Sequence, residues 1–123
     1  MKVLLFLAKG FETMEAGVFA DIMGWAGVEV TTCALRKTVT STFGVSVNAE
    51  ILLSDVCADD YDALAIPGGF EEYGAVVVNE PVVRTDNIIT SYCPQTGPDV
   101  AFMLLEELVG SEKMRETRTA MGF

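Results

Sequence analysis

Three features of the sequence predict an α/β fold with a mostly parallel sheet. The chain begins with a nearly all-apolar segment, Lys2–Ala8, which is typical of a strand in the middle of a parallel sheet. A helical pattern over Glu12–Ala26 then leads into a strand pattern over Val28–Leu35, and such a β-α-β unit makes its two strands parallel. A short apolar run, Ala63–Ile66, stops at Pro67-Gly68-Gly69, which indicates a buried strand that ends in a tight turn.

The predicted first helix has an apolar face and a defined end. Gly27 follows the helical pattern and is expected to end it. The spacing of the apolar residues predicts an inward face formed by Val18, Ile22, Trp25 and Ala26.

Shorter elements follow on either side of the Ala63–Ile66 strand. Thr38–Thr42 and Val45–Asn48 predict a hairpin, and Ser54–Asp60 predicts one acidic helical turn. Between Gly69 and Asn87 there is room for a crossover helix but no helical pattern. This valine-rich stretch instead indicates a hairpin, with Val76–Val78 and Pro81–Arg84 as short extended pieces. Thr85–Asn87 then predicts a turn, and Asn87–Tyr92 predicts a further strand.

The chain is expected to end in helices. Pro98–Val109 begins with a proline, which suits the first helical position, and continues with an acidic residue that suits the helix dipole. Its predicted apolar face consists of Val100, Leu104, Leu105 and Leu108. Gly110 ends this helix, and Ser111 with Glu112 opens a last short one.

Composition narrows the classes of function. The 123 residues suffice for one domain, and half of them are hydrophobic. A net charge of −10 argues against nucleic acid and anionic membranes as partners, because both require basic patches. The three cysteines, Cys33, Cys57 and Cys93, are odd in number and widely spaced, which predicts free thiols in a reducing cytoplasm. Neither a metal nor a cofactor site is expected.

Several segments form a recognisable set of motifs: Leu7–Glu15, Asp21–Gly27, Ala65–Gly69, Asn87–Ser91, Pro94, Gly97-Pro98 and the final helix. Together they resemble the ThiJ/PfpI family, which includes the DJ-one-like proteins and belongs to the class I glutamine-amidotransferase-like superfamily. The resemblance covers nearly the whole chain in two blocks, residues 1–74 and 75–123. It implies a single domain with a flavodoxin-like three-layer sandwich.

The middle of the family pattern has no counterpart in this chain. Family members continue after Pro-Gly-Gly into a helix and then a strand whose strained turn carries a nucleophilic cysteine, often with a histidine soon after. This chain has no histidine, and its two blocks join near Gly74-Ala75. The resemblance therefore implies a fold reduced by an internal deletion. Three origins stay open: a natural deletion, an engineered excision, or a sequence from which residues are omitted.

Two positions match the family's site. Glu15 matches the glutamate that hydrogen-bonds the catalytic cysteine, where a carboxyl can transfer protons. The alternative is a first-turn acid that the helix dipole favours. Gly68 and Gly69 match the loop whose backbone N–H groups help form an oxyanion hole. The alternative for them is a strand-ending turn that requires glycine.

Among the thiols, Cys93 is the one placed near the expected site edge, because it follows the Asn87–Tyr92 strand. A nucleophilic role would need a neighbouring base or positive charge, and none adjoins it in the sequence. We therefore interpret Cys93 as a bystander more readily than as a nucleophile. Cys33 is expected in the core, and Cys57 lies in an acidic segment whose carboxylates should make its thiol less reactive.

The resemblance leaves two hypotheses for function. The first is a cysteine-dependent enzyme of the hydrolase, amidase or glyoxalase/deglycase-like kind, acting on a small carbonyl or amide substrate, whose chain as given is incomplete or inactive. The second is a non-catalytic remnant that acts by binding or assembly. Without the nucleophile strand, the Ala63–Ile66 and Asn87–Tyr92 strands either pair directly or leave their edges exposed. Exposed edges predict a homo-oligomer, with exchanged elements as one form of it.

Overall fold

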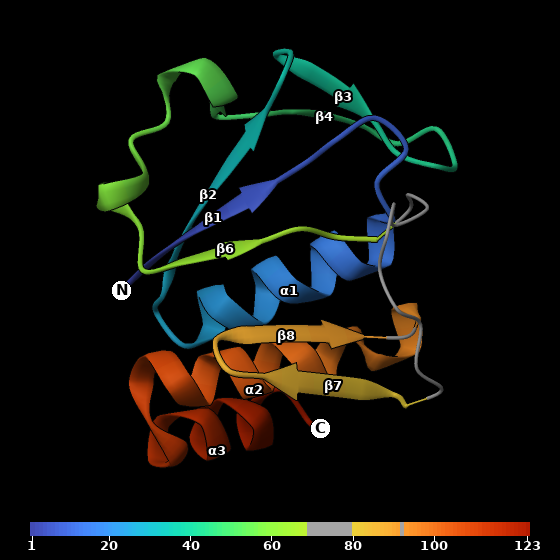
Figure 1. Ribbon diagram of the computed structural model, residues 1–123. Helices are drawn as coiled ribbons and strands as arrows, with labels where there is room; N and C mark the ends of the chain where they lie inside the picture. The colour runs from blue at the N-terminus through green and yellow to red at the C-terminus, as the bar shows by residue number, and fades with distance from the viewer. Residues whose placement is uncertain (69–79, 92) are drawn as a thin grey trace.

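A parallel four-stranded sheet forms the centre of the amino-terminal part of the molecule. The computed structural model of the protein describes residues 1–68, 80–91 and 93–123. The strand order in the sheet is β5-β2-β1-β6, and each neighbouring pair is parallel, as predicted (Figure 1). The strands are β1 (Lys2–Phe6), β2 (Glu29–Ala34), β5 (Ile51–Leu52) and β6 (Ala63–Ala65). The short strand β5 is an element that sequence reasoning missed.

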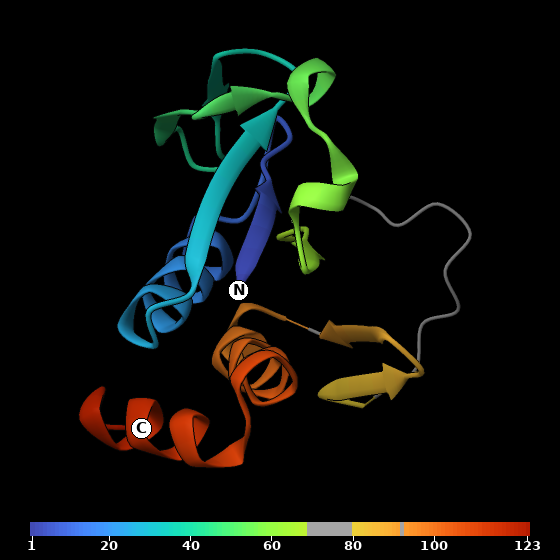
Figure 2. The same ribbon diagram turned by 90° about the vertical axis from the view of Figure 1, so that its left-hand side faces the viewer.

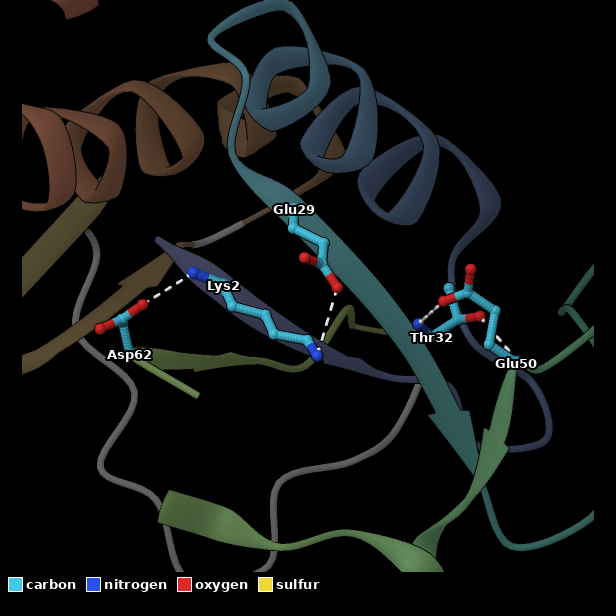
Figure 3. Close-up of polar contacts among 5 residues, drawn as sticks. All are labelled: Lys2, Glu29, Thr32, Glu50 and Asp62. Atoms are coloured by element: carbon cyan, nitrogen blue, oxygen red, sulfur yellow. Dashed lines mark hydrogen bonds and ion pairs between the residues drawn. The ribbon is translucent and has the colours of Figure 1, made fainter. Parts of the chain in front are cut away.

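Polar contacts at the start of β1 fix the register of β6 (Figure 3). The backbone N–H of Lys2 donates to the Asp62 carboxylate at 2.7 Å, and the N–H of Asp62 donates to the Lys2 carbonyl at 2.8 Å. On the other side, the Lys2 ammonium lies 3.2 Å from Glu29 at the start of β2. The hydrogen bond and charge of Glu29 raise the pKa of Lys2 above its usual value. A one-residue slip would break these contacts, because it would turn every side chain to the opposite face.

Helix α1 (Thr13–Trp25) connects β1 to β2 and packs on the sheet through Ala16, Phe19, Ile22 and Met23. The prediction that Trp25 belongs to the buried face was wrong, because 60% of its side chain is exposed. Trp25 lies two positions after Met23, which is about 200° around the helix, so it points to the opposite side. The helix itself and its end before Gly27 are as predicted, and Gly27 has a φ of 76°.

The segment between β2 and β6 contains a small antiparallel hairpin and two short turns of 3₁₀-helix. The hairpin pairs β3 (Thr38–Thr40) with β4 (Ser46–Asn48), as predicted. The single acidic turn expected over Ser54–Asp60 is instead two turns, at Leu53–Asp55 and Ala58–Asp60.

The carboxyl-terminal part consists of a β-hairpin and two helices. Strand β7 (Val82–Thr85) pairs antiparallel with β8 (Ile88–Ser91) around a turn in which Asp86 has a φ of 52°. Helix α2 (Gly97–Val109) and helix α3 (Ser111–Ala120) follow, as predicted. Figure 2 shows the hairpin standing apart from the main sheet. In the described part of the chain β8 pairs with β7 alone, so β6 and β8 leave their facing edges open instead of pairing directly.

One hydrophobic core joins the two parts through their helices. Helix α2 contributes its buried residues Ala101, Phe102 and Leu105 to the cluster that α1 and β1 also form. The predicted face of α2 was partly wrong, because Ala101 and Phe102 are buried while Val100, Leu104 and Leu108 are only partly so. Of the helices described, none is long and apolar enough to cross a membrane.

Candidate functional site

The candidate site lies where β6 ends against the first turn of α1. The Glu15 carboxylate accepts a hydrogen bond from the backbone N–H of Gly68. A Cβ at Gly68 would lie 2.8 Å from Glu15 Oε2, so a larger residue there would displace the end of the Glu15 side chain. The structure thus brings together two of the residues that the sequence singled out. Because the Gly68 N–H already donates to Glu15, it can serve an oxyanion only if that bond is exchanged.

Glu12 completes this arrangement, and sequence reasoning missed it. Its carboxylate accepts the N–H of Glu15 at 2.8 Å, and its own N–H donates to the Gly68 carbonyl at 2.8 Å. Glu12 is the residue before α1, so its carboxylate caps the helix, while its backbone N–H holds the loop at Gly68. The spacing of two glutamates three residues apart at a helix start was the signal that could have indicated this role.

The start of α2 closes the same site from the other side. A Cβ on Gly97 would lie 3.3 Å from Val18 Cγ1 and 3.8 Å from Glu15 Cα, so the two helices approach closely at this point. A larger residue at position 97 would press on the Val18 side chain, whereas its contacts with Glu15 would be of ordinary length. Gly97 therefore allows the start of α2 to pack closely against the first two turns of α1.

The predicted thiol does not line the site. Cys93 is half-buried in the residue before the 3₁₀ turn Pro94–Thr96, where its backbone is held by Thr96. The groove beside Glu15 is not lined by Cys93, Cys57 or Cys33. Burial raises the pKa of the Cys33 thiol, while Cys57 is exposed in the segment before β6. The predicted oxyanion residue Gly69 and the predicted junction at Gly74-Ala75 lie outside the described residues.

A groove of about 760 Å³ extends from Glu15 along the open edge of β6. Its floor is β6 with the residues that flank it, and its walls come from the β7–β8 hairpin and from α2. The groove has three exposed apolar side chains, of Leu64, Ile66 and Ile88. In the described part of the chain, no group of three or more acidic, cysteine or histidine side chains is placed to hold a metal ion.

Comparisons with known proteins agree with the motifs. The sequence model of the DJ-1/PfpI family matches residues 1–73. Protein dj-1beta of Drosophila melanogaster is 24% identical over 172 aligned positions, which cover 92% of this chain and 92% of that protein. Deglycase TK1284 of Thermococcus kodakarensis is 34% identical over 70 residues, which cover 56% of this chain and 42% of that protein.

Solved structures show the same fold. Oxidized DJ-1 of Toxoplasma gondii superposes with a TM-score of 0.86 at 22% identity, covering 98% of this chain and 97% of that one. The VC2308 protein has a TM-score of 0.89 at 21% identity, covering 99% and 93%. The predicted flavodoxin-like α/β class with a mostly parallel sheet is therefore confirmed.

Proposed function

This chain belongs to the DJ-1/PfpI family, and we propose that it acts by binding and does not perform the thiolate chemistry that the family resemblance implies. The observation that carries this proposal is the placement of the thiols. The chain has three cysteines and no histidine, and no cysteine lines the groove beside Glu15. A thiolate nucleophile must reach the substrate and must be activated by a base or a positive charge.

The proposed internal deletion explains how the site came to lack a nucleophile. The family match ends at residue 73, one residue before the predicted junction at Gly74-Ala75. The alignment with the Drosophila protein runs over 172 positions, which is longer than this chain of 123 residues. Both facts support a chain that continues the family pattern after a gap.

A second candidate is residual enzymatic activity on a small carbonyl or amide substrate. The relative named as a deglycase favours it, as does the contact between Glu15 and Gly68. In this case Cys93 would be the nucleophile, because it lies four residues before Gly97, which packs against Glu15. Glu15 would then exchange protons with the thiol or the substrate.

A turnover assay with methylglyoxal separates the two candidates. The intact mass is measured first, and a mass near 13.3 kDa shows that no further residues contribute. We expect no catalytic loss of methylglyoxal, that is, none beyond stoichiometric addition to exposed thiols. The Cys57→Ser variant removes the exposed thiol remote from the groove and so measures that background. Turnover that disappears in both Glu15→Ala and Cys93→Ser would instead establish the enzyme.

Two further expectations concern the cellular compartment and the oligomeric state of the protein. Three free cysteines favour a reducing compartment such as the cytoplasm. The homo-oligomer expected from open strand edges stays a prediction. Sedimentation velocity checks it, because an oligomer sediments faster than a single chain of 13.3 kDa.

A further inference from the structure

We propose that the groove beside β6 binds an extended peptide segment of another protein, with alternating apolar side chains and cationic residues at its ends. This inference rests on the proposal that the chain acts by binding, and it names the class of partner. Three properties of the groove carry it: an unpaired strand edge, exposed apolar side chains and an excess of negative charge.

The unpaired edge supplies backbone hydrogen-bonding groups. In the described part of the chain β6 pairs with β1 alone. The N–H of Asp62 donates to β1, and backbone groups alternate in direction along a strand, so those of Ala63 and Ala65 point to the open edge. A peptide that adds a strand to a sheet gains affinity from such groups. From Asp62 to Pro67 the edge accommodates about five extended residues.

The apolar side chains supply specificity for the segment. Leu64 is 58% exposed, Ile66 is 62% exposed and Ile88 is 60% exposed, and all three line the groove. Strands β6 and β8 point the same way in Figure 1, and β8 is the nearer strand of the hairpin to β6 in both Figure 1 and Figure 2. An inserted segment would have β6 on one side and β8 on the other, and it would cover these side chains.

The charge of the groove favours a cationic occupant. Arg84 is paired with Glu107 at 2.7 Å, so its charge is already neutralised. The other charged groups that the structure places along the groove are the carboxylates of Glu15, Asp62 and Asp86. A lysine at each end of the segment would therefore meet negative potential.

The same features argue against a second copy of this chain as the occupant. The β6 edge is the floor of a groove that is walled by the hairpin and α2, so a slender segment reaches it more readily than another folded domain. Each copy also carries a net charge of −10, which opposes its approach to an acidic groove.

The first experiment measures binding of the peptide Lys-Val-Thr-Val-Thr-Val-Lys-amide, with fluorescein attached to its amino-terminal nitrogen, by fluorescence anisotropy. We expect saturable binding that weakens with added salt. A matched peptide with glutamate in place of both lysines should bind at least about tenfold more weakly, because its negative charges meet the carboxylates of the groove.

Variants locate the binding. Leu64→Lys should abolish it, because the new charge repels the peptide and removes an apolar contact. Leu35→Lys is the matched control, since Leu35 is 71% exposed and lies outside this groove. Ile88→Lys on the opposite wall is a second test that does not alter the main sheet. Circular dichroism melts show that each variant folds.

Hydrogen exchange tests the pairing at single amides. With peptide bound, the amides of Ala63 and Ala65 should gain protection, while that of Leu64, which points to β1, should not change. Equal binding of the two peptides, or binding that Leu64→Lys and Ile88→Lys leave unchanged, overturns the inference. Self-association that Leu64→Lys abolishes also overturns it, because the occupant is then a second copy. The methylglyoxal assay is independent, so turnover would contradict the proposed function without altering these readouts.

Discussion

The two regions of this protein are held together in different ways. In residues 1–68 the strands of the main sheet are hydrogen-bonded to their neighbours and α1 covers one face. In residues 80–123 the two strands form a separate hairpin, and α2 and α3 supply the packing. The sheet layer is interrupted between β6 and β8, whereas the helix layer continues from α1 to α2. In the described residues, the packing of α1 against α2 therefore joins the two regions, and strand pairing does not.

The first and largest expected effect is a difference in thiol labelling. Cys33 lies buried in β2, Cys57 is exposed and Cys93 is half-buried before α2. Because Cys33 reacts only when the main sheet opens, its labelling by iodoacetamide should be at least about a thousandfold slower than that of Cys57. Cys93 should lie between them. Equal rates for Cys33 and Cys93 would mean that both regions open together.

The raised pKa of Cys33 also makes the stability of the protein depend on pH. The neutral thiol is favoured in the folded state, so its contribution to stability is complete below the ordinary pKa of about 8.5. That contribution is lost as pH rises through the higher pKa of the folded state. Unfolding in urea should therefore become easier above about pH 8.5 in the parent protein but less so in Cys33→Ala.

The next largest effect concerns the helix layer. Leu105 is fully buried in α2, within the core shared with α1. Leu105→Ala should lower the free energy of unfolding by about 2 to 5 kcal/mol through lost burial and a cavity. Urea titrations followed by circular dichroism measure this loss, with the exposed Leu35→Ala as control. Since the regions share one core, a single transition is expected. If the variant lost helix signal in a first step and sheet signal in a second, the regions would be independent.

A smaller effect is expected within the first region, at the contact between β6 and α1. Gly68→Ala places a methyl group against Glu15 and displaces the end of a flexible side chain. We expect a loss of about 1 kcal/mol, the usual net contribution of one hydrogen bond. In a Glu15→Ala background the same substitution should cost almost nothing. Additive losses in the double variant would show that the two residues act separately.

Much of the fold could be predicted because its signals are local. Each signal determines the structure of the segment in which it lies: the apolar run in β1, the glycine after α1 and the proline at the start of α2. The extended segments Pro81–Arg84 and Asn87–Tyr92 and the turn between them were also predicted, but their pairing as the β7–β8 hairpin was not. The hairpin indicated between Gly69 and Asn87 includes Val76–Val78, which lies outside the described residues. Strand β5 could not be predicted, because its two residues pair with Cys33 and Ala34 far away in the sequence.

The candidate site could be predicted in part. The motif resemblance identified Glu15 and Gly68, which the structure places in contact. The resemblance did not identify Glu12, whose role depends on a backbone carbonyl across the loop. The groove was also beyond sequence reasoning, because it exists only where two strands fail to meet in space. The outward turn of Trp25 shows that apolar residues near a helix end need not face the core.

The smallest effect compares one surface ion pair from each region. Arg84 and Glu107 lie 2.7 Å apart and join the hairpin to α2, whereas Lys2 and Glu29 lie 3.2 Å apart within the main sheet. All four side chains are substantially exposed, so double-mutant cycles should give couplings of about 0.2 to 1 kcal/mol for both pairs, and less in high salt.

The Arg84–Glu107 cycle uses Arg84→Gln and Glu107→Gln, which keep polar side chains of similar length. A weak coupling means that the hairpin is attached to α2 by apolar packing, as the rest of the second region is. A coupling well above about 1 kcal/mol would exceed that of ordinary exposed pairs and would mean that one ion pair holds the hairpin. The wall of the groove would then open as salt rises, and the salt dependence of peptide binding would report wall movement as well as peptide charge.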